Sequence, residues 1–215
     1  MESFAKHLAQ LGWEIHVVTA ARAIAADDTA GVHVHVIDDP LEAHVPIVDD
    51  YDPRRTTPMW RKWLRNFTLP DRFKVWGQAA AKEATRLVSD LNIELVLASF
   101  PPASVVSAVM SVYDKTRAAF VLDFRDRWLG PGGYEPVRAA ALGKHQALEH
   151  RAIKAARGIV AISEAMASAI AEEHGYPRER IFVIPNGYEP WSDEHAPTPP
   201  SPPPLIVSHV GTVIA

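Results

Sequence analysis

The chain has 215 residues, no cysteine, a formal net charge of −4 and a pI near 6.2. This length suits one domain of ordinary size, or one domain and part of another. The charge argues against nucleic-acid binding by bulk electrostatics, and the lack of cysteine excludes disulfides, thiolate metal sites and cysteine nucleophiles. No apolar run approaches the about 20 residues of a membrane-spanning helix, and the first residues lack the layout of a signal peptide. We therefore expect a cytoplasmic protein with no nucleic-acid partner.

The first half of the chain is predicted to hold helices and strands around a long loop. Phe4, Leu8 and Leu11 fall on one helical face, and Gly12 is placed to end that helix. The elements expected after it are strands over 14–20 and 32–38, a loop over 38–58, and helices over 58–67 and 71–91.

The second half alternates strands and helices more regularly, and its strands are continuous apolar runs. The expected elements are strands over 93–99, 118–124, 158–163 and 180–185, and helices over 103–116, 137–157 and 164–174. Apolar strands that alternate with helices are typical of a parallel sheet covered on both faces. We therefore predict an α/β protein with a Rossmann-like parallel sheet and helices on both faces.

Four of these strands end in residues that form turns or caps, namely Ser99, Asp123, Ser163 and Pro185. Ligands of parallel sheets bind outside the carboxyl ends of the strands. The Pro-Asn-Gly turn in "RIFVIPNGYEP" is therefore expected to face a binding crevice together with the other three strand ends.

A proline-rich segment near the C-terminus predicts a domain boundary. The stretch "APTPPSPPP" holds six prolines in nine residues, which excludes helix and central strand and indicates an extended linker. We assign a Rossmann-like domain to 1–194, the linker to 195–204 and the start of a second domain to 205–215. A Rossmann-like domain ordinarily begins with a strand, whereas this chain begins on a helix. The first strand is therefore expected to be missing, and the chain to be a fragment.

Five motifs occur in a defined order along the chain: "FAKHLAQLGWEIHVVTA", "DFRDRW", "ALEHRAIKAARGIVAISEAMASAI", "IPNGYE" and "HVGT". In this order they resemble the N-terminal half of glycosyltransferase family 4 enzymes, over nearly the whole chain. The resemblance implies the GT-B arrangement of two facing Rossmann-like domains. It also implies transfer of a sugar from a nucleotide-sugar with retention of configuration and without a metal ion or other cofactor. The acceptor would lie mostly on this domain and the donor mostly on the second.

The resemblance further implies a hexosyltransferase that acts on a sugar or lipid-linked acceptor in glycan or cell-envelope polysaccharide synthesis, at the inner face of the membrane. The family's glycine-rich loop would precede Met1, and most donor-binding residues would follow Ala215. This domain alone is therefore expected to be inactive. Many members carry a His-Asp pair where this chain has Arg125 and Asp126, so these two residues are the catalytic candidates.

The chemistry of Arg125 and Asp126 suits a polyol substrate. Arginine is a permanently charged, forked donor that matches sugar or phosphate oxygens, and a carboxylate accepts hydrogen bonds from sugar hydroxyls. Fixed charge would also stabilise a departing diphosphate. The alternative is an internal Arg–Asp ion pair that only shapes the loop.

The remaining site candidates also have structural alternatives. Asn186 and Gly187 suit a tight turn as well as a ligand contact, and Ser163 suits a helix cap. The acceptor-binding candidates are Ser99, Asp123, Trp128, Asn186 and Glu189. The donor-binding candidates are Ser163, Gly187, Gly211 and Thr212, the last two by resemblance alone.

A basic, tryptophan-containing segment predicts contact with a membrane surface or a lipid-linked acceptor. Trp60, Leu64 and Phe67 share one helical face, and "RRTTPMWRKWLRNF" contains no acidic residue. The alternative is an amphipathic helix packed on the domain with a solvated basic rim. The membrane-contact candidates are Arg54, Arg55, Trp60, Arg61, Lys62, Trp63 and Arg65.

The other interpretations are a metal site, an epimerase and a membrane-binding module. No metal site is expected, because His33 and His35 share a strand face but no third ligand with metal spacing is near them in the sequence. An epimerase of UDP-N-acetylglucosamine would share the two-domain layout. A non-catalytic, Rossmann-like module that binds a membrane surface is the third alternative, because a fold does not fix a function.

Overall fold

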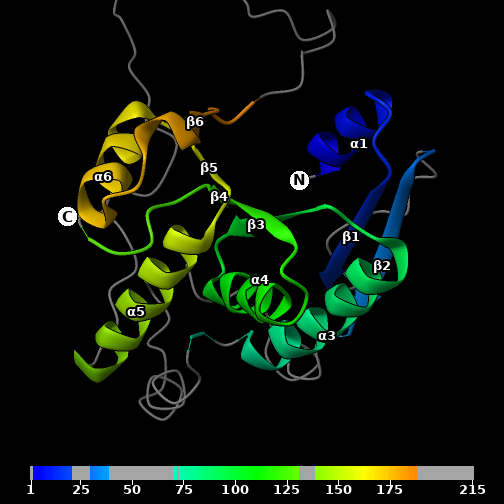
Figure 1. The fold of residues 1–215 in the computed structure, drawn as a ribbon, viewed down its shortest axis with the longest axis horizontal. Helices are drawn as coiled ribbons and strands as arrows, with labels where there is room; N and C mark the ends of the chain where they lie inside the picture. The colour runs from blue at the N-terminus through cyan, green and yellow to red at the C-terminus, as the bar shows by residue number, and fades with distance from the viewer. Residues whose placement is uncertain (1, 21–29, 39–69, 72, 131–138, 188–215) are drawn as a thin grey trace, which may run out of the picture. The chain divides into compact units, whose positions relative to one another are not determined.

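The computed structural model describes residues 2–20, 30–38, 70–71, 73–130 and 139–187 (Figure 1). The chain divides into two compact units, Met1–Pro185 and Asn186–Ala215. All helices and strands described here belong to the first unit. The predicted boundary near residue 194, the proline-rich linker and the basic segment 54–67 lie outside the described residues, so these assignments remain predictions.

The described elements confirm an α/β protein. In chain order they are α1 (Glu2–Gln10), β1 (Ile15–Ala20), β2 (Val32–Ile37), α3 (Lys74–Leu91), β3 (Leu95–Phe100), α4 (Ala103–Thr116), β4 (Ala119–Phe124), α5 (Ala139–Ala155), β5 (Gly158–Ala161), α6 (Glu164–His174), a 3₁₀ turn η3 (Arg178–Arg180) and β6 (Ile181–Val183). Gly12 follows α1 with a φ of +88°, as expected of a glycine that ends a helix.

Every strand pairing that the structure describes is parallel. The strands β3 to β6 form one sheet in the order β3-β4-β5-β6, and β1 and β2 form a separate two-stranded sheet. The sequence predicted a single sheet. The difference arises because β1 is hydrogen-bonded only to β2, and β3 only to β4, among the described residues. The strand expected ahead of α1 stays a prediction.

The core packs helices α4, α5 and α6 on the four-stranded sheet. One continuous cluster of buried residues draws on all of β3 to β6 and on these three helices. Its largest fully buried apolar side chains are Trp128, Phe120, Phe124, Leu122, Ile153 and Ile159. The buried Tyr176 hydroxyl donates to the Ala156 carbonyl at 2.9 Å, which ties the segment after α6 to the end of α5. This core holds the carboxyl ends of β3 and β4 in place.

The parallel register of β1 and β2 brings three histidines together. His16 lies opposite His33, and Val18 lies opposite His35, so His16 shares a face with both histidines of β2. No third ligand lies near His33 and His35 in the sequence, but strand pairing brings His16, which is 17 and 19 positions away, close to both. The expectation that the protein has no metal site stays a prediction. Among the described residues, each helix is too short or too polar to span a lipid bilayer.

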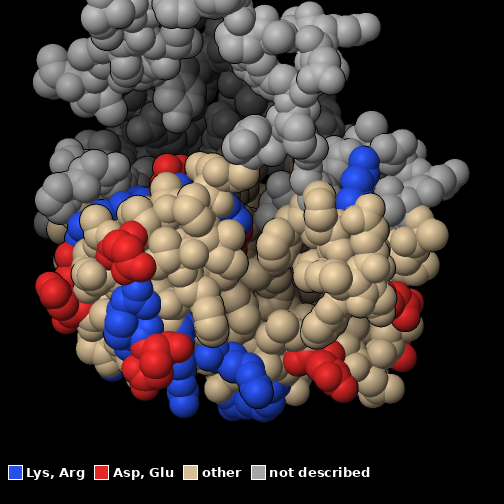
Figure 2. Space-filling view, turned by 90° about the horizontal axis from the view of Figure 1, so that it is seen from above, with Lys and Arg blue, Asp and Glu red and all other residues tan. Residues whose placement is uncertain are grey.

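On the face drawn in Figure 2, the positive and negative side chains of the described residues are interspersed. No extended patch of a single charge sign covers the described part of that face.

Candidate functional site

The carboxyl ends of β3 and β4 bring together three of the residues that the sequence singled out. Ser99 lies opposite Asp123 in the parallel register, and Arg125 follows β4 directly. The Ser99 hydroxyl donates to Asp123 Oδ2 at 2.9 Å, and Arg125 Nε donates to the same oxygen at 2.9 Å. The Arg125 amide also bonds to the Phe100 carbonyl at 2.9 Å, so the backbone of the loop continues the pairing of the strands.

Asp123 is the buried centre of this group. Its side chain is 2% exposed, whereas that of Arg125 is 29% exposed. A buried carboxylate requires hydrogen bonds or an opposite charge, and Asp123 Oδ2 has both. Its second oxygen, Oδ1, has no hydrogen-bond partner among the described residues. The Arg–Asp ion pair that would shape the loop is thus present, and within the described part of the chain the buried Asp123 Oδ1 beside it has no partner.

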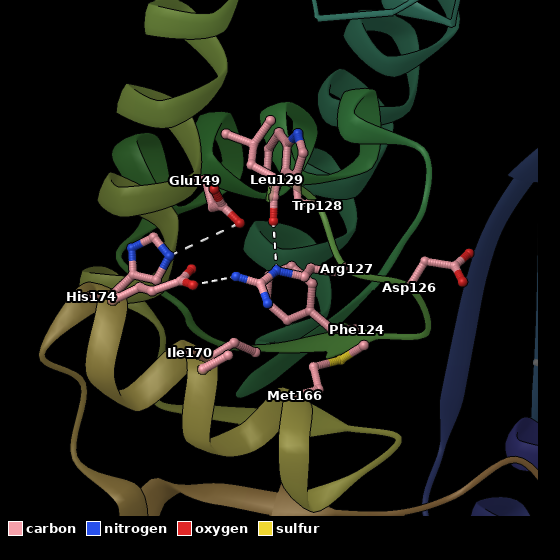
Figure 3. A pocket seen from close by; sticks show the side chains of 11 residues that line it. Phe124, Asp126, Arg127, Trp128, Leu129, Glu149, Met166, Ile170 and His174 are labelled. Atoms are coloured by element: carbon pink, nitrogen blue, oxygen red, sulfur yellow. Dashed lines mark hydrogen bonds and ion pairs between the residues drawn. The ribbon is translucent and has the colours of Figure 1, made fainter. Parts of the chain in front are cut away.

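Asp126 and Trp128 differ from each other in their surroundings. Asp126 is exposed and points away from the other labelled side chains in Figure 3. Trp128 is 1% exposed, stacks on Phe100 with ring centroids 4.9 Å apart, and donates from Nε1 to His145 Nδ1 at 3.2 Å. The structure therefore places Trp128 in the core beneath the loop and not at the surface that a substrate would reach.

Ser163 forms the helix cap that the sequence allowed. Its hydroxyl accepts from the Met166 amide at 3.2 Å, and its own φ of −151° is the extended value typical of an N-cap. The side chain is therefore committed to an amide of α6 in this structure.

We expect Ser163→Ala to lower the free energy of unfolding by about 1 kcal/mol, because it removes the acceptor for an otherwise unpaired amide. Urea denaturation measures the change. Ser168→Ala is the matched control, since Ser168 is exposed in the middle of the same helix. That control should be neutral or slightly stabilising. Equal stability of the Ser163 variant and the unsubstituted chain would contradict a capping role.

The other predicted site residues lie in the second compact unit or outside the described residues. Asn186 and Gly187 are the first residues of the second compact unit. Glu189, Gly211 and Thr212 lie outside the described residues. Their acceptor-binding and donor-binding roles remain predictions.

A second polar group lies in a pocket between the loop after β4 and the helices α5 and α6 (Figure 3). Arg127 donates from Nε to the Leu129 carbonyl at 2.7 Å and forms an ion pair with Glu173. Gly130 has a φ of +90°, and a Cβ there would lie 2.8 Å from an Arg127 nitrogen. A glycine at this position therefore allows Arg127 to fold back over the turn.

Glu149 is the buried acid of this pocket and was not among the predicted site residues. The pKa of Glu149 is raised to about 7, chiefly by burial and secondly by the nearby Glu173, while Arg127 and a hydrogen bond to the Leu129 backbone partly offset the rise. His174 Nε2 lies 4.0 Å from Glu149 Oε1, and burial followed by the neighbouring His150 lowers the pKa of His174.

A sequence signal for Glu149 exists. Four residues recur at helical spacing on one face of α5 and are all buried, namely His145, Glu149, Ala152 and Ile153. His145 and Glu149 are titratable residues on an otherwise apolar helix face, and this pattern indicates that the fold buries them.

The described residues thus define an α/β domain of parallel strands with a buried polar group at the carboxyl ends of neighbouring strands. Over residues 1–187 the chain matches the model of the glycosyl transferase 4-like domain, and it therefore belongs to this family. It is a glycosyltransferase domain, as the sequence resemblance indicated. A comparison with curated proteins found no match.

Proposed function

We propose that this chain is the acceptor-side domain of a retaining glycosyltransferase. The enzyme would transfer a hexosyl group from a nucleotide-sugar to a sugar or lipid-linked acceptor in the synthesis of a glycan or cell-envelope polysaccharide. The observation that carries the proposal is the Ser99–Asp123–Arg125 group at the carboxyl ends of β3 and β4 in a domain of the family. Ligands of parallel sheets bind at this edge.

Each member of the group has a chemical role in the proposal. Asp123, whose side chain is 2% exposed, would act through its partners, because it holds the Ser99 hydroxyl and the Arg125 guanidinium in place at the strand ends. Arg125, held at Nε by Asp123, carries a fixed positive charge beside the site, where it would stabilise negative charge on the departing diphosphate. The exposed Asp126 would accept from a second hydroxyl of the acceptor or of the reacting sugar.

The proposal includes several features that rest on the family resemblance. Transfer would require no metal ion, and the domain alone would bind the acceptor without turnover. The enzyme would work in the cytoplasm at the inner face of the membrane, with segment 54–67 in contact with lipid.

Ligand-observed NMR with a panel of nucleotide-sugars and of mono- and oligosaccharide acceptors tests the proposal. The samples are this chain and the full-length enzyme. We expect acceptor signals with this chain, and donor binding with formation of a new glycoside only in the full-length enzyme. Asp126→Asn should weaken the acceptor signals, whereas Asp114→Asn, at an exposed aspartate on α4, should not.

The product separates the proposal from its rivals. An isomerised nucleotide-sugar instead of a glycoside would identify an epimerase. Binding of neither donor nor acceptor, with salt-sensitive co-sedimentation on anionic vesicles, would identify a membrane-binding module and overturn the proposal.

A further inference from the structure

Three histidines and a glutamate form a compact group on the two-stranded sheet β1–β2. His16 stacks on His33 with ring centroids 4.7 Å apart and on His35 with centroids 5.3 Å apart. Glu14, one residue before β1, places Oε1 3.3 Å from His16 Nε2 and 3.6 Å from His33 Nε2. Each of these three residues, Glu14, His16 and His33, offers one ligand atom, and the three atoms all lie within 4.8 Å of one another. This is the only such group found in the described part of the chain.

Two of the three separations in this group fit a tetrahedral metal ion, and the third lies within 4.8 Å. Zinc binds histidine nitrogen and carboxylate oxygen at about 2.0–2.2 Å, so two ligand atoms of a tetrahedral site lie about 3.4 Å apart. The two contacts of Glu14 Oε1, at 3.3 and 3.6 Å, are close to that separation. Two histidines and one glutamate are also the donor set of several zinc sites that keep a fourth position for water.

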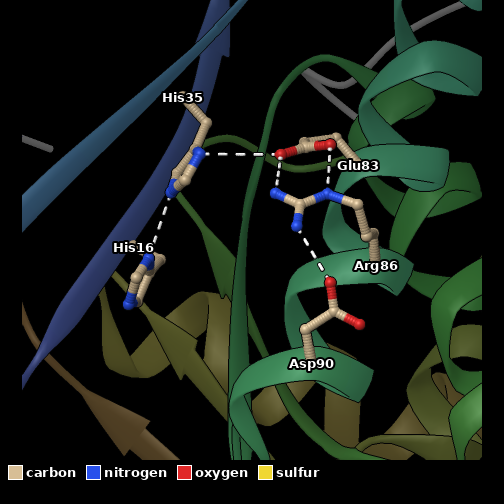
Figure 4. Close-up of polar contacts among 5 residues, drawn as sticks. All are labelled: His16, His35, Glu83, Arg86 and Asp90. Atoms are coloured by element: carbon tan, nitrogen blue, oxygen red, sulfur yellow. Dashed lines mark hydrogen bonds and ion pairs between the residues drawn. The ribbon is translucent and has the colours of Figure 1, made fainter.

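A chain of contacts behind His16 orients the group (Figure 4). His16 Nδ1 and His35 Nε2 are hydrogen-bonded at 3.0 Å, and His35 Nδ1 lies 3.6 Å from Glu83 Oε1. If Nδ1 carries the proton in both rings, His35 turns an N–H to Glu83, and His16 donates to His35. With an ion bound, the lone pair of His16 Nε2 would then be directed away from His35 and toward the ion beside Glu14. Without the ion, the same nitrogen is placed to donate to Glu14 Oε1 at 3.3 Å. A ligating histidine ordinarily donates its other N–H to such a partner, which fixes its tautomer and orientation.

Glu83 is itself held in position. Arg86 donates to both of its oxygens, from Nε at 3.0 Å and from Nη2 at 2.7 Å, and its Nη1 donates to Asp90 at 2.9 Å. The support therefore reaches from α3 to the sheet through Glu83, His35 and His16. The two histidines beside Glu14 differ in exposure: the His16 side chain is 11% exposed, whereas the His33 side chain is 53% exposed.

We propose that Glu14, His16 and His33 bind a borderline divalent transition-metal ion of the zinc class, with His35 and Glu83 as orienting partners of His16. The ion would join the residue before β1, β1 itself and β2, and so hold the two strands in register. The site lies on a different sheet from the Ser99–Asp123–Arg125 group, and its metal takes no part in the proposed transfer. The proposal is therefore independent of the proposed function.

Calorimetric titration of the tag-free chain with Zn²⁺ at pH 7.5 tests the proposal. We expect one bound ion per chain and an affinity at least tenfold weaker in His33→Gln, in Glu14→Gln and in His16→Gln. His33 and Glu14 are exposed, so their variants test binding without a risk to folding. His35→Gln should weaken binding tenfold to a hundredfold, as expected of an orienting partner.

His150→Gln is the matched control. His150 pairs with His174 across α5 and α6, with 3.4 Å between the two Nδ1 atoms, but it belongs to no group of three ligands among the described residues. Its affinity for Zn²⁺ should equal that of the unsubstituted chain.

Titration with Co²⁺ in place of Zn²⁺ gives a second readout, because a tetrahedral site produces intense visible absorption. We expect that absorption in the unsubstituted chain and its loss in His33→Gln. No Zn²⁺ binding, or binding that is unchanged in both His33→Gln and Glu14→Gln, would overturn the proposal and leave a stacked, hydrogen-bonded histidine group.

Discussion

Arg125→Ala in the proposed glycosyltransferase is expected to lower kcat/KM by about a hundredfold or more, in line with the loss of one fixed donor to developing charge. The same substitution should lower the free energy of unfolding by about 3 kcal/mol, because it leaves the buried Asp123 carboxylate without its cation. Turnover assays and urea denaturation measure the two effects separately. Arg151→Ala, at an exposed arginine paired with Asp114, is the control and should change neither quantity much.

A second substitution separates catalysis from support of the loop. Asp123→Asn combined with Arg125→Ala removes the buried charge together with its partner, so stability should recover in large part. Activity should not recover, because the cation at the site is still absent. Recovery of both stability and turnover in the double variant would mean that Arg125 only neutralises Asp123.

Glu149→Gln is expected to stabilise the protein, and the gain should grow with pH. The folded-state pKa of Glu149 is raised to about 7, above its ordinary value of 4.5. Its contribution to stability is therefore fully present below about pH 4.5 and is lost as the pH rises through 7. A pKa shift of this size corresponds to about 3 kcal/mol in the free energy of unfolding. Glutamine at the same position would not lose this stability, because it does not ionise.

Unfolding measured between pH 4.5 and 8 checks this prediction. The difference between Glu149→Gln and the unsubstituted chain should be small at pH 4.5 and approach about 3 kcal/mol at pH 8. Arg127, Glu173 and His174 also face Glu149, but they are present in both chains, so the difference isolates the carboxyl group. A flat difference for Glu149→Gln would contradict the raised pKa.

Local signals predicted the helices well. Helix α6 begins after Ser163 and ends before Gly175, whose φ is +57°, and both ends agree with the residue range predicted from the sequence. Helix α4 likewise spans the predicted range, starting after Pro102. Caps, glycines and prolines act over a few residues, so the chain alone specifies them.

Long-range pairing was predictable only in part. Parallel strands that end in polar residues indicated that Ser99 and Asp123 would share an edge, and they do. The approach of His16 to His33 depends on the register of β1 and β2, which no local pattern specifies. The place of Trp128 in its motif predicts contact with the acceptor, whereas its indole N–H donates to His145 within the core.

The hydrogen bond between Ser99 and Asp123 also has a consequence for folding. These two residues are register partners on β3 and β4. A slip of one residue would turn Asp123 to the opposite face of the sheet, and a slip of two would move it about 7 Å along its neighbour. Either error would enclose an acidic group without its hydroxyl partner. The residues that hold the candidate site therefore also discriminate against misaligned strands, so a domain with a competent site is one in which β3 and β4 have paired in the correct register.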